Sequence, residues 1–222
     1  MGMIGCLTAG LINGALFTLG PVFGHQIGLS VPGISLFMGA TVLGGLVLQW
    51  PVGPLSDHFD RNVVMAGLGL VVAFISLAIA LLMRESFFLL ITLTILYGGV
   101  AFTLYPVAVA HTHDFFPPDD IVAVSSALLL SFGLGASIGP PAAAMVMKLI
   151  GPSGLYVFIA AVSSVFGGSV AVFLHRKPER LEADYPVRFM AIRTSSPVIA
   201  VLDPRAEARL PSDGSSTADA CD

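Results

Sequence analysis

A short charged turn between two long uncharged runs is the feature that most restricts how this chain folds. The turn spans residues 49–62 and includes Asp57, Asp60 and Arg61. The flanking runs, residues 34–50 and 63–83, contain no Asp, Glu, Lys or Arg. A bilayer core about 30 Å thick needs roughly 20 apolar residues per helical crossing. The pattern therefore predicts two membrane helices joined by a turn in water.

The composition places the rest of the chain in lipid as well. Of the 222 residues, 55% are hydrophobic and 11% are charged, and the mean hydropathy is +0.90. A soluble domain carries about 25% charged residues, so this chain lacks the polar surface that water requires. In lipid each segment must pair its own backbone groups, which favours helices over barrel strands for long apolar runs without alternation.

Six stretches are long and apolar enough to be membrane helices. They are residues 4–24, 33–52, 63–83, 87–110, 121–150 and 155–175. Because the first Lys or Arg is Arg61, the first stretch lacks the cationic region of a signal peptide, and we interpret it as a retained helix. We expect an all-α membrane protein with a six-helix transmembrane domain over residues 1–176.

Residues 177–222 differ in character from the rest. Pro, Ser, Asp, Glu and Arg accumulate there, and the final stretch has almost nothing to bury. This composition is typical of disorder. We expect a disordered tail, and a solvated linker explains it better than a partner-binding strip.

The order of residues in the charged turn, Gly-x-Leu-x-Asp-x-x-x-Arg, resembles the loop signature of the major facilitator superfamily, secondary transporters with two six-helix halves. Four residues match the signature: Gly53, Leu55, Asp57 and Arg61. The resemblance implies a conformational-switch loop, whose Asp contacts the positive N-terminal end of a helix in the opposite half. Three ordinarily basic positions hold other residues: Pro54, His58 and Asn62. We therefore expect the contact between Asp57 and the opposite half to be weaker or rearranged.

The resemblance covers about residues 1–176 and favours the C-terminal half of a bacterial member, given Pro106 in the fourth helix and the long tail. It implies transport of a small solute by alternating access. Since members have about twelve helices, we expect this chain to be incomplete alone and to need a second six-helix half or a second copy. A fragment, a truncated gene product and one half of a split transporter remain alternatives. A membrane scaffold or regulatory subunit derived from a transporter half is the rival function.

Polar residues inside the first and fourth helices are the candidates for substrate contacts, because these helices line the central cavity in the facilitator plan. They are Asn13, Tyr97, Thr103 and Tyr105. Each is costly in lipid unless it faces a cavity or a partner, and hydrogen bonding to neighbouring helices is the alternative role. In an isolated half we expect the first three to face hydrocarbon. No Asp, Glu, Lys or Arg lies at mid-membrane depth, so a proton-coupling carboxylate would come from the other half.

Small residues and prolines mark packing and bending. Gly-x-x-x-Gly occurs at residues 10–14, 20–24 and 135–139, which predicts close helix contacts. Gly139, Pro140 and Pro141 follow in the fifth helix, and the two prolines remove two backbone donors. We expect a bend there, which in transporters serves as a hinge.

Enzyme and metal sites fit the sequence less well. An intramembrane serine protease needs Gly-x-Ser-Gly, and residues 167–170 (Gly-Gly-Ser-Val) lack the last glycine. His111, His113 and Asp114 do not share one helix face, so a helix end meeting water explains them better than a metal site. We expect no enzyme activity, no metal, no cofactor and no nucleic-acid partner, with membrane lipid as the surroundings.

Positive charges set the orientation in a bacterial inner membrane. If the turn at Arg61 is cytoplasmic, the cations just past the last helix are also inside, and only Arg84 and Lys148 lie outside. Both termini, including the tail, are then cytoplasmic.

A reporter fused after Asp222 tests this orientation. We expect a reporter that works only in the cytoplasm to be active, because Lys and Arg near the last helix are retained inside. Activity of a periplasm-only reporter at the same position would reverse the topology.

Overall fold

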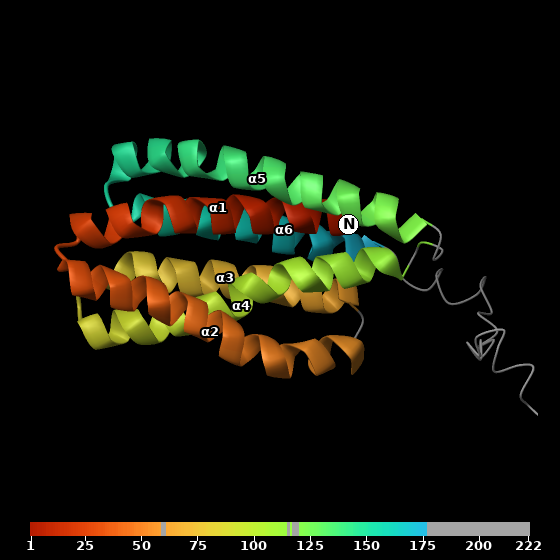
Figure 1. The fold of residues 1–222 in the computed structure, drawn as a ribbon, viewed down its shortest axis with the longest axis horizontal. Helices are drawn as coiled ribbons and strands as arrows, with labels where there is room; N and C mark the ends of the chain where they lie inside the picture. Colours follow the sequence, from red (N-terminus) through yellow and green to blue (C-terminus); the bar gives the residue numbers. More distant parts are fainter. Residues whose placement is uncertain (59–60, 115, 117–119, 177–222) are drawn as a thin grey trace, which may run out of the picture. The chain divides into compact units, whose positions relative to one another are not determined.

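The computed structural model describes residues 1–58, 61–114, 116 and 120–176. It contains six helices that alternate in direction (Figure 1). They are α1 (Gly2–Gln26), α2 (Val31–His58), α3 (Arg61–Leu82), α4 (Phe87–His113), α5 (Ile121–Ile150) and α6 (Gly154–Arg176). The described residues include no strand, and the predicted all-α class is confirmed. The predicted disordered tail, residues 177–222, lies outside the described part of the chain.

Within the described part of the chain, five helices are long and apolar enough to cross a membrane: α1, α3, α4, α5 and α6. In α2 the apolar segment within the described residues is Val31–Val47. A helix rises 1.5 Å per residue, so the 22 residues of α3, the shortest of the six, extend about 33 Å, enough for a hydrocarbon core of about 30 Å. The lengths therefore agree with a multi-pass arrangement.

The helix α2 is longer than the sequence indicated. We expected it to end at residue 52 and a turn to span residues 49–62, but α2 continues to His58 and α3 begins at Arg61. The predicted turn was too long because it was placed by its charged residues, which a helix can carry where it leaves the lipid. Pro51 and Pro54 lie within the helix. A proline inside a helix removes one hydrogen bond and favours a kink, and the helix can continue beyond it.

Three helix pairs make the principal contacts of the bundle. These pairs are α1 with α5, α3 with α6, and α2 with α4, and α1 also contacts α4 and α6. Figure 1 shows α5 running beside α1, on the side away from α2. The interior is apolar and includes the fully buried side chains Leu16, Phe23, Met65, Leu104 and Tyr156. Because α1 and α4 each touch four other helices, these two are the central elements of the bundle.

Backbones approach each other where glycines of α1 and α5 meet. A Cβ atom added to Gly10 would overlap the carbonyl oxygen of Phe132, and one added to Gly139 would overlap that of Leu11. Gly135 faces the α1 backbone in the same way. Lipid tails are as apolar as the side chains, so such contacts gain dispersion energy that larger residues would prevent. The predicted role of the Gly-x-x-x-Gly pattern in packing is confirmed for this pair.

Substituting Gly10 tests how much the close approach matters. We expect Gly10→Ala to lower the free energy of unfolding by about 1–3 kcal/mol, because the methyl group would meet backbone that can move only with the whole helix. The measurement is unfolding of the purified chain in mixed micelles, followed by circular dichroism. The matched control is Gly133→Ala on α5, where a Cβ meets nothing within 4 Å. Equal stabilities of the two variants would contradict the packing argument.

Candidate functional site

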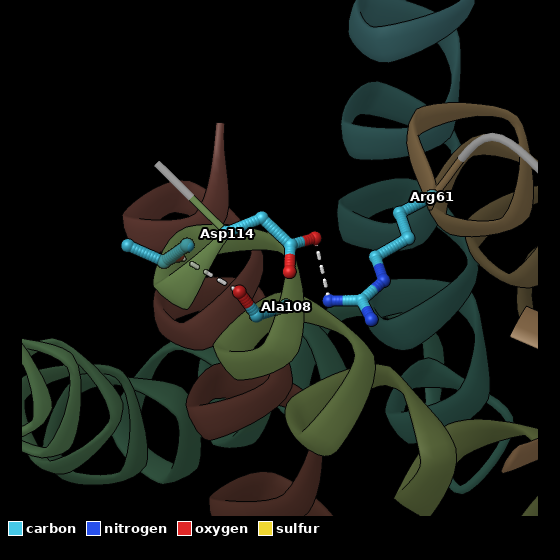
Figure 2. Close-up of polar contacts among 4 residues, drawn as sticks. Arg61, Ala108 and Asp114 are labelled. Carbon is cyan, nitrogen blue, oxygen red and sulfur yellow. Dashed lines mark hydrogen bonds and ion pairs between the residues drawn. The ribbon is translucent and has the colours of Figure 1, made fainter. Parts of the chain in front are cut away.

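An ion pair joins the start of α3 to the end of α4. Nη1 of Arg61 lies 2.6 Å from Oδ2 of Asp114, the residue that follows the last turn of α4 (Figure 2). Charge-assisted hydrogen bonds of this kind are short and directional. The two side chains are 25% and 51% exposed, so water screens the attraction and its contribution to stability is about 0–1 kcal/mol. The main effect of the pair is to hold two helix ends together.

The last turn of α4 has further contacts. A hydrogen bond joins His113 Nε2 to Ser125 Oγ in α5 at 3.0 Å, and Thr112 Oγ1 donates to the carbonyl oxygen of Ala108 at 2.9 Å (Figure 2). The end of α4 is thus tied to both α3 and α5. These polar contacts gather where the helices end, as expected for the boundary between lipid and water.

The described residues hold no group of three metal-ligating side chains. α4 ends at His113, so the interpretation of His111, His113 and Asp114 as a helix end is confirmed. The histidine and aspartate side chains instead form the helix-to-helix contacts just described, since His113 bonds α5 and Asp114 pairs with α3.

Of the four residues that match the loop signature, only Arg61 has a described side chain. Gly53, Leu55 and Asp57 lie in the last turns of α2, and their side chains are outside the described part. Sequence reasoning missed Asp114 as a partner of Arg61. The alternating direction of successive helices could have indicated this pair. In an antiparallel bundle the third helix starts at the membrane face where the fourth ends, so a cation and an acid at these two positions can meet.

Three of the four cavity candidates lie inside the bundle. Asn13, Tyr97 and Thr103 are all buried. The expectation that they would face hydrocarbon in an isolated half is wrong. Thr103 Oγ1 donates to the carbonyl oxygen of Gly99 at 2.7 Å, which satisfies the hydroxyl within its own helix. Their role in substrate binding stays a prediction.

Five buried side-chain oxygen atoms lack a hydrogen-bond partner among the described residues, and two of them belong to cavity candidates. Asn13 Oδ1 and Tyr97 Oη are buried and accept or donate no hydrogen bond there. The Tyr97 ring lies edge-on to Tyr156 of α6, with centroids 5.6 Å apart, and Tyr156 in turn lies edge-on to Phe23 of α1. An unpaired buried polar group costs about 1–3 kcal/mol. These atoms therefore favour any rearrangement that brings a polar group to them.

The fourth candidate, Tyr105, is half-buried and belongs to a set of paired rings. It lies edge-on to Phe132 of α5, with centroids 5.0 Å apart. Three residues before it, Phe102 stacks on Phe17 of α1 with centroids 5.6 Å apart and an interplanar angle of 15°. We call these four residues the aromatic face. The sequence did not single out its three phenylalanines, because a phenylalanine in an apolar helix looks the same whether it meets lipid or another ring.

The predicted hinge lies within a continuous helix. α5 runs from Ile121 through Gly139, Pro140 and Pro141 to Ile150. Because prolines have no N–H, the carbonyl groups of Ala136 and Ser137 receive no helical hydrogen bond from them. These are weak points of the helix backbone, and a hinge there stays a prediction.

Comparison with known proteins assigns the family. The sequence model of the Major Facilitator Superfamily matches residues 2–206. The MFS-type transporter YcaD of Escherichia fergusonii is 35% identical over 168 residues, which cover 75% of this chain and 42% of the relative. An MFS-type transporter of Enterobacter sp. (strain 638) is 34% identical over 166 residues, with 75% and 42% coverage. YcaD of Escherichia coli O17:K52:H18 is 34% identical over 168 residues, again with 75% and 42% coverage.

The chain thus spans about two fifths of the length of these curated relatives. All three are transporters by name, so the family agrees with the expectation that the chain is not an enzyme. The helices and the family agree on a membrane protein that crosses the bilayer several times. The chain belongs to the major facilitator superfamily, whose members here are bacterial membrane transporters.

Proposed function

We propose that this chain is a six-helix half, equivalent to the C-terminal half, of a secondary transporter that moves a small solute by alternating access. The observation that carries the proposal is the family match over residues 2–206 in a chain that covers 42% of its relatives' length. A six-helix bundle with its own apolar interior supports it. The rival function, a membrane scaffold or regulatory subunit, has no observation in its favour.

The second half, or a second copy of the chain, completes the carrier in this proposal. Support comes from α5, the least buried of the five long helices. It exposes Leu130, Leu134, Ile138 and Met145 along its length. Lipid can also cover an apolar face of this kind. Gly133 and Ser137 lie between these residues, however, and small residues on a helix surface permit close approach of another helix. We infer that α5 packs on the missing half.

The charged end of the bundle serves as the conformational switch in this proposal. Asp57 contacts a helix N-terminus of the opposite half in one state, where a carboxylate is stabilised by the helix dipole. The Arg61–Asp114 pair lies within this half. It ties the start of α3 to the end of α4. The connection between α2 and α3, which contains the loop signature, therefore moves together with the rest of the bundle. In the proposed switch, this ion pair orients the loop in place of the basic residues that are absent at Pro54, His58 and Asn62.

The proposed location is the bacterial inner membrane with both termini in the cytoplasm. The start of α3 and the end of α6 lie at the same end of the bundle (Figure 1). Arg61 and Arg176 therefore share one membrane face, opposite the ends of α3 and α5 that lie near Arg84 and Lys148. This grouping supports the assignment of the Arg61 face to the cytoplasm.

Reconstitution tests whether the chain is incomplete alone. We expect no saturable uptake of labelled small solutes into liposomes that contain only the monomeric chain, because a cavity between two halves needs both. Uptake should appear when a six-helix chain that co-purifies with it is added. Empty liposomes are the control, and the oligomeric state is measured in parallel.

The outcomes separate the alternatives. Saturable uptake by the monomer would overturn the half-transporter proposal. Uptake only by a dimer of this chain would make the second copy the partner. Absence of uptake with every six-helix partner that forms a stable complex would favour the scaffold.

Substitutions at the charged end test the switch. In the complete carrier we expect Asp57→Asn to lower the transport rate by an amount that corresponds to about 0.3–2 kcal/mol, the range for a charge at a helix terminus. Asp114→Asn should also lower it, because the ion pair that joins α3 to α4 is lost, while leaving insertion unchanged. The matched control is Asp120→Asn at the start of α5, for which the structure gives no ion pair among the described residues. A wild-type transport rate in both Asp57→Asn and Asp114→Asn would leave these two acids without a switching role.

A further inference from the structure

The aromatic face lies near the middle of three helices. Phe17 is in the central part of α1 (Gly2–Gln26), Phe102 in that of α4 (Phe87–His113) and Phe132 in that of α5 (Ile121–Ile150). Phe102 and Tyr105 are three residues apart, so they lie on the same side of α4. If these helices span the bilayer, the four rings are near its midplane. Carriers built from helix repeats bind their solutes at this depth.

The rings are held in place before any ligand arrives. Phe102 fits against α2, where a Cβ atom on Gly45 would overlap its ring. On its other side it stacks on Phe17, which is itself 51% exposed. Tyr105 is fixed in the same manner by Phe132. A surface whose side chains are already ordered loses little entropy when a ligand binds.

A lipid-facing phenylalanine in this protein has different surroundings. Phe74, in the middle of α3, is 75% exposed, and it takes part in none of the ring pairs found among the described residues. The aromatic face combines an exposed ring with three half-buried rings in two pairs, contributed by α1, α4 and α5. Lipid contact needs only apolar side chains, so it does not account for this clustering.

The chemistry of the face indicates which solutes fit. The segments 2–26, 87–113 and 121–147 contain no Asp, Glu, Lys or Arg. A charged solute would lose its hydration here without gaining a counter-ion from these helices. A sugar would need several hydrogen-bond partners, and the face offers the single hydroxyl of Tyr105 among its rings. A flat aromatic molecule can instead stack on the exposed ring of Phe17.

We propose that the aromatic face is the substrate-binding surface of this half and that it selects uncharged, planar aromatic solutes. This inference rests on the proposed transport function for its role. The Tyr105 hydroxyl positions one polar substituent of the solute, and Phe17 and Phe102 bind its ring system.

Photolabelling of the purified full chain in nanodiscs tests the proposal. The probes are a neutral azidonaphthalene, an azidonaphthalene carboxylate, an azidonaphthalene ammonium and an azide-bearing hexose. We expect saturable labelling by the neutral probe, competed by naphthalene, at peptides of α1, α4 and α5. Phe17→Ala and Phe102→Ala should each weaken the apparent affinity about threefold to tenfold, the effect of losing one ring contact. Phe74→Ala is the matched control and should leave the affinity unchanged.

The outcomes test the binding surface, the solute class and the transport function separately. Labelling that does not saturate, or that Phe74→Ala reduces as much as Phe17→Ala, would show partitioning into lipid and overturn the proposal. Stronger saturable labelling by the hexose or a charged probe would overturn the solute class and leave the transport function standing. Saturable neutral labelling in a chain that never supports uptake with any partner would support the binding face while overturning transport. Circular dichroism of each variant confirms that helices are retained.

Discussion

The absence of water from the hydrocarbon core is the constraint on which this structure depends. Every backbone group in the core must be paired within its helix, and three buried threonine hydroxyls follow the same rule. Thr41, Thr94 and Thr103 each donate to the carbonyl oxygen four residues earlier. Hydroxyls that are satisfied within their own helix do not join one helix to another, so packing supplies most of the helix-to-helix contact. The contact of Gly10 and Gly139 with the opposing backbones is the direct result.

The same constraint separates two kinds of chemistry along the bundle. Ionic and imidazole contacts, such as Arg61 with Asp114 and His113 with Ser125, lie where helices end and water is near. The ring pairs of the aromatic face lie near the helix middles, where rings can interact through their faces and edges without solvent. A carrier requires both: a charged end that distinguishes conformations and a middle that recognises the solute. In this chain Asp114 of the ion pair lies at the end of α4, and Phe102 and Tyr105 of the aromatic face lie in the middle of the same helix.

The length of the chain relative to its relatives and the packing of its interior bear on where a solute could pass. It covers 42% of relatives that are transporters by name, and its most exposed long helix, α5, combines apolar residues with Gly133 and Ser137. The interior of the half is already filled by side chains such as Tyr97 and Tyr156. A solute path inside these six helices would require repacking that interior. In the proposed carrier, a path along their surface, against a second half, would leave this interior packed as it is.

The sequence by itself determined the membrane class, the number of helices and the family, because hydrophobic length and the spacing of Gly53, Leu55, Asp57 and Arg61 are local properties of the chain. It overestimated the turn at residues 49–62, since charged residues mark where a segment leaves the lipid and do not say where its helix ends. Only the tertiary structure decided which way side chains point. Asn13, Tyr97 and Thr103 face inward, Phe17 meets Phe102, and Arg61 meets Asp114. In helices that are apolar on all sides, the sequence carries almost no periodic signal for the buried face, and packing between distant segments sets it.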